Sequence, residues 1–273
     1  MLDLDPTSLR DWMAAVGLLR LVSETSEKGR LLWLLDRGRY RLEGRDVPND
    51  LAERGADWIE AHKSEWSFAG QKNVNFPAAT WRHAAASAQG LEAAMWCAVG
   101  SDAVMHRSGS KVQASGLEYG HGGGHQHWLA SMRDFLNGAV KAEHLTRILS
   151  GGRDERMKGP ICRWDPECER NHAYRAIAPT DDKPTQDQTI NALAAIGLAS
   201  CPSAPTQRGL LTPLVDGNAL FWPVWLDELR LADLEAALCC GWMWPTMRGR
   251  RWLSGKLYCF SRGELCEPLA SPI

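Results

Sequence analysis

Hydrophobic and polar residues alternate along this chain with two different periods, which predict helices in some segments and strands in others. Over residues 9–19 the apolar positions are three and four apart, the spacing of one face of a helix. Two candidate caps, Thr7 and Ser8, precede this segment, and the charged residues Arg10 and Asp11 lie off its apolar face. Similar spacing predicts further helices at residues 51–62, 78–99, 125–140, 189–201 and 231–238.

Strand patterns are shorter and fewer. Residues 31–35 and 40–42 are predicted to form two strands around a turn, and residues 252–260 favour another strand. The polar segment 153–183 has no clear period, so we interpret it as a long functional loop. The predicted class is α+β, an irregular multi-helix subunit with short strands. We expect an N-terminal α+β region with a Gly-rich loop (1–150) and a C-terminal helical and irregular region (151–273), as two units or as one domain.

One short pattern occurs twice. Residues 14–18 read Ala-Ala-Val-Gly-Leu, and residues 194–198 read Ala-Ala-Ile-Gly-Leu. Because a glycine inside a helix costs about 1 kcal/mol relative to alanine, close packing of helix backbones would explain it. Coincidence between two Ala-rich helices is the simpler explanation.

The composition changes this picture in three respects. Thirteen tryptophans outnumber phenylalanine and tyrosine together, and such rings suit interfaces as well as cores. The net charge of −2 excludes a polycation that binds bulk DNA tightly by itself, but local basic clusters stay open. Eight cysteines without disulfide-framework spacing, an acidic N-terminus and the lack of a long apolar run lead us to expect a reduced, cytoplasmic protein.

The segment 105–128 carries the most informative polar pattern. Its glycines precede a predicted helix, so free backbone N–H groups would meet the positive end of the helix dipole and suit a phosphate. No Lys-Ser or Lys-Thr follows the glycines, which excludes a Walker loop. A flexible turn with a helix cap explains the pattern equally well. The predicted nucleic-acid contacts here are Arg107, Ser110, Lys111, Gly122, Gly123, Gly124, His125 and Gln126.

Two further clusters combine cations or amides with aromatic residues, at 66–73 and 242–252. Arginine on phosphate, together with aromatic stacking on bases, is the usual chemistry of nucleic-acid grooves. A solvated charged loop beside a Trp-lined core is the alternative. The predicted contacts in these clusters are Gln71, Lys72, Asn73, Arg248, Arg250 and Arg251.

Metal and catalytic patterns are weak. Neither candidate metal group contains a paired Cys-x2-Cys, and three glycines make a poor rigid cage. The chain has no Gly-x-Ser-x-Gly or His-Glu-x-x-His motif, so we predict no catalytic residue, no metal and no cofactor. The two candidate groups are His121, His125 and His127 with Glu118 nearby, and Cys162, Cys168 and His172.

Several short blocks over most of the chain share one resemblance. They are Asp5-Pro6-Thr7 leading into residues 14–19, residues 69–72, 122–126 and 163–166, Arg170 with Tyr174-Arg175, residues 191–194, Pro202 with Pro205, and residues 222–225. Together they resemble the variable subunits of type I CRISPR loci, chiefly of subtype G (formerly U), in the place of the large subunit.

The resemblance implies a non-catalytic DNA-binding subunit of a crRNA-guided Cascade complex in antiviral defence. Such a subunit recognises the protospacer-adjacent motif in the duplex beside the target and aids strand opening. Its implied partners are a crRNA-containing multi-subunit ribonucleoprotein complex, double-stranded target DNA, the backbone and crRNA-end subunits and a separate helicase–nuclease, without a membrane.

At 273 residues the chain is short for a large subunit, so we expect a separate small-subunit-like bundle to be missing or reduced. Two other functions stay open from the residues. One is a metal-dependent nuclease or nucleotidyl-processing enzyme using His121, His125 and His127. The other is a purely structural scaffold subunit.

Overall fold

The computed structural model describes residues 2–36, 39–102, 111–120, 127–138, 140–152, 156–168, 185–206, 209–254 and 257–266. Within these ranges it contains eight α-helices and short β-strands, most of which pair in two-stranded sheets. The predicted α+β class with a helical majority is confirmed. In the same ranges, none of the helices combines the length and the apolar character needed to cross a membrane.

Helices make up 45% of the structure and strands 24%. The α-helices are α1 (Leu9–Thr25), α2 (Leu51–His62), α3 (Ala78–Ser87), α4 (Gly90–Val99), α5 (Trp128–Asn137), α6 (Ala142–Leu149), α7 (Gln188–Gly197) and α8 (Leu231–Cys240). Short 3-10 helices are η1 (Lys63–Trp66), η2 (Phe68–Gly70), η3 (Pro166–Cys168) and η5 (Leu198–Ser200).

The strands are short except for β1, β2 and β11. They are β1 (Arg30–Asp36), β2 (Arg39–Arg45), β3 (Gly100–Ser101), β4 (Gln113–Ala114), β5 (Arg156–Lys158), β6 (Thr185–Asp187), β7 (Ala204–Thr206), β8 (Gly209–Leu211), β9 (Val215–Asp216), β10 (Ala219–Pro223), β11 (Thr246–Ser254), β12 (Leu257–Phe260) and β13 (Glu264–Cys266).

Helix α1 begins where the pattern predicts, but it is buried on every side rather than along one face. The Ser8 side chain accepts a hydrogen bond from the Asp11 N–H and so caps the first turn. Arg10 is 6% exposed because its guanidinium pairs with Asp11 at 2.9 Å and with Asp165. Charged side chains are tolerated at such depth only when they are paired. The sequence pattern could not show this burial, since the partner Asp165 is 155 residues away.

Helices α1 and α7 cross backbone to backbone. A β-carbon built on Gly17 would lie 1.9 Å from the Leu193 carbonyl oxygen, and one on Gly197 would lie 2.1 Å from the Met13 carbonyl oxygen. The two contacts are reciprocal, and only glycine leaves room for them. The repeated Ala-Ala-(Val/Ile)-Gly-Leu pattern therefore marks this crossing, and coincidence is the wrong explanation for it.

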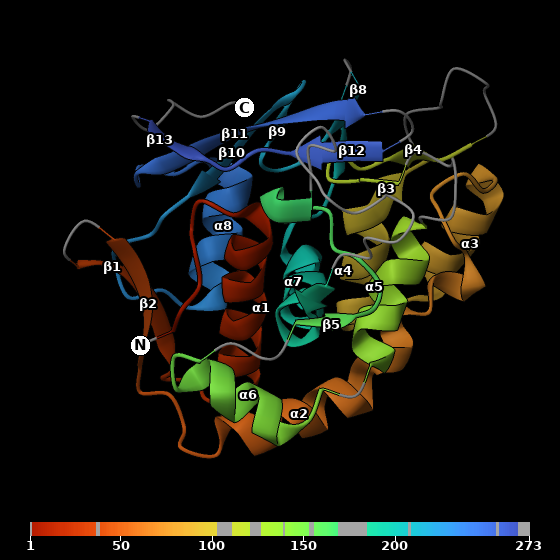
Figure 1. Ribbon diagram of the computed structural model, residues 1–273. Helices are drawn as coiled ribbons and strands as arrows, with labels where there is room; N and C mark the ends of the chain where they lie inside the picture. The colour runs from red at the N-terminus through yellow and green to blue at the C-terminus, as the bar shows by residue number, and fades with distance from the viewer. Residues whose placement is uncertain are drawn as a thin grey trace, which may run out of the picture.

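The largest sheet lies across one end of the molecule. Figure 1 shows it above α1, α7 and α8, whereas α2 and α6 lie at the opposite end. Its strand order is β12-β11-β10-β9, and β13 also pairs with β11. All of these pairs are antiparallel, and β11 pairs with β10, β12 and β13. The side chains of β11 therefore point alternately to the core side and to the outer side of the sheet.

Three predicted boundaries are wrong. The segment 78–99 is broken into α3 and α4, because Ala88 and Gln89 are extended and Gly90 has a φ of +54°. The segment 252–260 is not one strand but the hairpin between β11 and β12. Helix α5 begins at Trp128 rather than near residue 125. In contrast, α2, α7, α8 and the β1–β2 hairpin lie where the pattern predicts them.

Candidate nucleic-acid interface

The predicted arginine cluster lies on β11 and is divided between the two faces of the sheet. Arg248, Arg250 and Trp252 occupy alternate positions of the strand, and all three are exposed. Gly249 between them is buried against Trp222 on the core side. The outer face of β11 therefore carries a row of two guanidinium groups and an indole ring. We call these three residues the β11 row.

The surroundings of the β11 row are hollowed and partly acidic. Arg248 lies over the Phe221 ring, with its guanidinium carbon 5.8 Å from the ring centroid. A hollow of about 370 Å³ is lined by Arg248, Arg250, Ser261, Arg262 and Glu264. Arg262 forms ion pairs with Asp5 and Glu167 at the surface, so its charge is balanced by carboxylates of the protein itself.

In contrast, Arg248 and Arg250 form no ion pair with any side chain that the structure describes. Within the described residues, Arg248 and Arg250 are therefore the cations of this hollow without an ion pair, and Glu264 lies opposite Arg248 across the β11–β13 pair.

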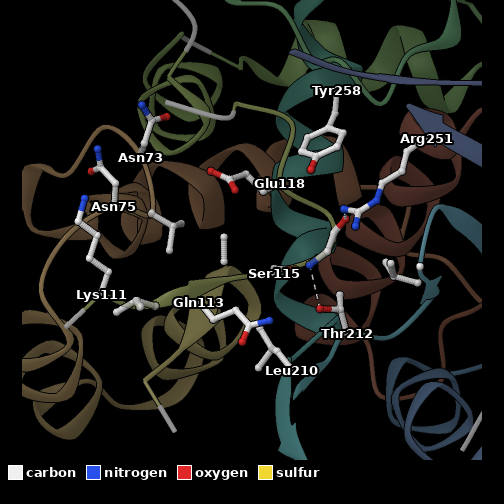
Figure 2. Close-up of a pocket in the computed structure, with 16 residues that line it drawn as sticks. Asn73, Asn75, Lys111, Gln113, Ser115, Glu118, Leu210, Thr212, Arg251 and Tyr258 are labelled. Atoms are coloured by element: carbon white, nitrogen blue, oxygen red, sulfur yellow. Dashed lines mark hydrogen bonds between the residues drawn. The ribbon is translucent and has the colours of Figure 1, made fainter. Parts of the chain in front are cut away.

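Arg251 points to the core side and reaches a second hollow, a pocket of about 470 Å³. The pocket lies between the 73–75 segment, the 111–118 segment, the start of the β9–β10 region and the β11–β12 hairpin (Figure 2). It brings together three predicted site residues from distant parts of the chain, Asn73, Lys111 and Arg251. Its other polar side chains include Asn75, Gln113, Ser115, Glu118, Thr212 and Tyr258.

The charged groups of this pocket are strongly affected by burial. Removal from water raises the pKa of Glu118 to about 8, although the positive charge of Arg251 opposes the rise. Burial also lowers the pKa of Arg251, against the opposing influence of Tyr258 and Glu118. Arg251 and Glu118 thus interact electrostatically at a distance, but they do not form a direct ion pair. At neutral pH the Glu118 carboxyl is predominantly protonated and can donate a hydrogen bond as well as accept one.

Arg251 is held by two contacts and keeps one free donor. Its Nη1 donates to the Gly116 carbonyl oxygen, and its guanidinium carbon lies 5.0 Å from the Tyr258 ring centroid. Within the described part of the chain, its buried Nε has no hydrogen-bond partner. Such unpaired buried donors are not confined to this pocket, because Arg20 Nε and Trp128 Nε1 also lack a partner within the described residues.

The predicted cluster Gln71, Lys72 and Asn73 lies against the start of α5. The Asn73 side chain accepts from the Trp128 N–H at 2.9 Å and contacts His127 Nδ1 at 2.9 Å. The Lys72 carbonyl accepts from the next two N–H groups of the helix, and the Gln71 carbonyl accepts from Arg133. The N–H groups of the first three residues of α5 are therefore already used, which leaves none of them for a phosphate.

The Gly-rich segment itself falls outside the described residues. This applies to the predicted contacts Arg107, Ser110, Gly122, Gly123, Gly124, His125 and Gln126, and to His121. Lys111 directly follows the first group of undescribed residues, 103–110, and Gly120 and His127 flank the second group, 121–126. Lys111 lines the pocket, and His127 contacts Asn73, which also lines it. The described residues Lys111 and His127 therefore lie in this pocket or in contact with its lining.

Each of the two candidate metal groups contains at least one residue outside the described part of the chain. There, no three His, Cys, Asp or Glu side chains are grouped as metal ligands. His127 is engaged by Asn73, while His121, His125 and His172 lie outside the described residues. Cys168 accepts a hydrogen bond from Gln186 Nε2 at 2.7 Å, and the same amide nitrogen bonds to the Cys162 carbonyl.

Several blocks that carry the family resemblance meet in the core. Trp222 donates to the Pro6 carbonyl and Trp12 donates to the Pro223 carbonyl, each at 2.7 Å. Asp165 pairs with Arg10 near the start of α1. These residues therefore hold the N-terminus, the 163–166 segment and β10 together, and their role is structural.

Of the residues that line this pocket, the sequence predicts only Asn73, Lys111 and Arg251 as contacts, so Glu118 and Tyr258 are among those that it does not predict. Glu118 was considered only as a metal ligand, because its burial depends on segments far away in the sequence. Tyr258 was not considered, since only the β11–β12 register, in which Leu253 faces Tyr258, brings it to the same side as Arg251. In a strand, the consecutive side chains of Arg250, Arg251 and Trp252 point alternately to opposite faces, and this was the available signal for a strand with two polar faces.

Comparison of the chain with protein-family models and with curated proteins finds no significant match. The geometry of the site therefore has to carry any functional conclusion.

Proposed function

We propose that this chain is a non-catalytic DNA-binding subunit of a crRNA-guided type I CRISPR effector complex. In this proposal it binds the duplex next to the target, recognises the protospacer-adjacent motif and aids strand opening. The single observation that carries the proposal is the β11 row. The sequence resemblance supplies the type of complex.

The β11 row suits the backbone of a nucleic acid. Residues two apart on a strand are separated by about 7 Å, so Arg248 and Arg250 can contact neighbouring phosphates of one strand. Trp252 continues the row with a ring that is 38% exposed, and exposed indoles stack on unpaired bases. Phosphate contact and stacking are both needed where a duplex is held and then opened.

A net charge of −2 fits a subunit rather than a free DNA-binding protein. Two unpaired arginines give only a weak electrostatic footprint, so neighbouring subunits and the guide RNA must supply the remaining affinity. In guided complexes, base pairing with RNA reads most of the sequence, while protein groups read a short duplex motif. We therefore expect the isolated chain to bind duplex DNA weakly and the assembled complex to bind it tightly.

The test uses the complex purified with its guide RNA and a duplex that contains the matching target. The double variant Arg248→Gln/Arg250→Gln should lower the slope of log affinity against log salt by about 1.8, because two phosphate contacts are lost. The matched control is Arg45→Gln/Arg54→Gln, which removes two exposed arginines from β2 and α2. Failure of the chain to co-purify with guide RNA, or equal salt slopes in both double variants, would contradict the proposal.

The enzyme alternative is separated by a cleavage assay. We expect no turnover of DNA, RNA or nucleotides in the presence of Mg²⁺, Mn²⁺ or Zn²⁺. Metal-dependent cleavage that is lost in His127→Ala would contradict the proposed function and favour a metal-dependent nuclease. In the structure, the His127 side chain contacts Asn73.

A further inference from the structure

The pocket behind β11 has the size of a small-ligand site. Its volume of about 470 Å³ falls within the range of roughly 300–1,000 Å³ that is typical of pockets for small molecules. A single inorganic ion would leave most of that space empty. The size of the pocket therefore favours a ligand that has a larger body in addition to a charged part.

The walls of the pocket differ in chemistry. Lys111 and Asn75, both exposed, lie at one end, and Arg251 with Tyr258 lies at the other, with Glu118 between them (Figure 2). In the part of the chain that the structure describes, the Lys111 ammonium forms no ion pair. Apolar side chains complete the lining, from Val74, Val112, Ala114, Leu210 and Val215.

This distribution matches one class of ligand. A phosphate needs an accessible cation, which Lys111 provides, and a planar base needs apolar walls with polar groups at its edge. Glu118 and Arg251 are such edge groups, because a carboxyl can accept or donate and the N–H groups of a guanidinium can donate. Guanidinium and carboxyl groups are also the ones that proteins use to read base edges.

The pocket is linked to the β11 row through Arg251. A neighbouring hollow of about 480 Å³ is lined by Asn218, Ala219, Arg250, Arg251 and Trp252. Arg251 thus contributes to both hollows, and Arg250 and Trp252 of the β11 row line the outer one. A nucleic-acid strand that lies along the β11 row would therefore pass beside Arg251, which lines both hollows.

We propose that the pocket behind β11 holds one unpaired nucleotide, with its phosphate at Lys111 and the edge of its base at Glu118 and Arg251. The shared chemistry of a base and a phosphate fits two sources, a nucleotide extruded from a bound strand and a free mononucleotide. The first source rests on the proposed function and would hold the strands apart after opening. The second does not need that function.

The first experiment titrates the isolated full-length chain by calorimetry with the four deoxynucleoside monophosphates, the four nucleosides and inorganic phosphate. The best nucleotide should bind at least about tenfold more tightly than its nucleoside or phosphate alone, since each part adds contacts. Lys111→Gln should weaken nucleotide binding by about tenfold and leave nucleoside binding unchanged, because it removes one charge-assisted contact. Lys28→Gln, an exposed lysine outside the pocket, is the matched control.

Glu118→Gln tests the base edge separately. The variant keeps the shape of the side chain but fixes a neutral amide, so the order of preference among the four nucleotides should change. In the wild-type protein the preference should also change between pH 6 and pH 9, and in Glu118→Gln it should not. A lower affinity for all four nucleotides by the same factor would mean that Glu118 does not contact the base.

The second experiment distinguishes the two sources with a fully paired duplex and the same duplex carrying a one-nucleotide bulge. Tighter binding of the bulged duplex by the complex, lost in Lys111→Gln, identifies a nucleotide of a strand. Binding of the mononucleotide without any gain from the bulge identifies a free nucleotide.

Two results would overturn the inference. One is that inorganic phosphate binds as well as any nucleotide, which means an anion site only. The other is that neither mononucleotides nor the bulge depend on Lys111. Neither result affects the salt slope of Arg248→Gln/Arg250→Gln, so the proposed function and the pocket fail independently.

Discussion

The α1–α7 helix pair and the β11 strand differ in how they treat polar groups. In the helix pair, the backbones touch at Gly17 and Gly197, and the charged Arg10 is fully paired inside the protein. On β11, Arg248 and Arg250 face outward and form no ion pair with any residue in the described part of the chain. The helix pair also contains two buried atoms without a partner among the described residues, Arg20 Nε and Asn191 Oδ1, so the difference lies in the ion pairs. Charges that are paired internally stabilise the fold, whereas unpaired surface charges are available to a ligand.

The helix pair is where a single substitution should have the largest effect. In Gly17→Ala, the new methyl group meets a backbone carbonyl that no rotamer change can move, so we expect a loss of more than about 3 kcal/mol in the free energy of unfolding. Gly55→Ala is the control, because a β-carbon there meets only the ends of Leu145 and Leu21 at 3.3 and 3.4 Å. Equal unfolding free energies of the two variants in denaturant titrations would break the comparison.

The buried ion pairs give the next largest effect. Arg10→Ala leaves Asp11 and Asp165 buried without their cation, which costs about 3–5 kcal/mol. Arg262→Ala removes the same kind of pairs at the surface, with Asp5 and Glu167, and should cost at most about 1 kcal/mol. Similar midpoints in chemical denaturation would mean that the Arg10 pairs do not stabilise the core.

Prediction from the sequence succeeded where the information was local. The Ser8 cap, α2 and the β1–β2 hairpin follow from residues next to one another, and the glycine repeat marked the α1–α7 crossing without revealing its meaning. The pocket could not be predicted as a pocket, because Asn73, Lys111 and Arg251 are brought together only by tertiary contacts. The sequence predicts each of them separately as a nucleic-acid contact, and no local pattern encodes their proximity.

Glu118 provides a pH-dependent test of the binding region. Its pKa rises from 4.5 to about 8 on folding, so between these values the unfolded chain is ionised and the folded protein is not. Unfolding then releases a proton, and raising the pH favours it. The contribution to stability is fully present below pH 4.5 and is lost as the pH rises to about 8.

The measurement compares wild type with Glu118→Gln from pH 4 to pH 9, with Arg251, Lys111 and Tyr258 present in both. The difference in unfolding free energy should change by more than about 1 kcal/mol, the value of one pKa unit. A difference that stays constant across this range would show that Glu118 is ionised normally, and the carboxyl could then not donate to a base.

The smallest expected effect concerns η2, which leads into the residues that cap α5 and line the pocket. Ala69 is exposed and has a φ of 48° and a ψ of 35°, the left-handed conformation that costs an L-residue about 1 kcal/mol. Glycine removes that cost but loses more entropy on folding, so Ala69→Gly should stabilise the protein by about 0.5 kcal/mol. Ala86→Gly, at an exposed position of α3, should instead destabilise it by about 0.5–1 kcal/mol. If both substitutions lower the melting temperature equally, the left-handed turn before Gln71 is not the conformation that positions Asn73.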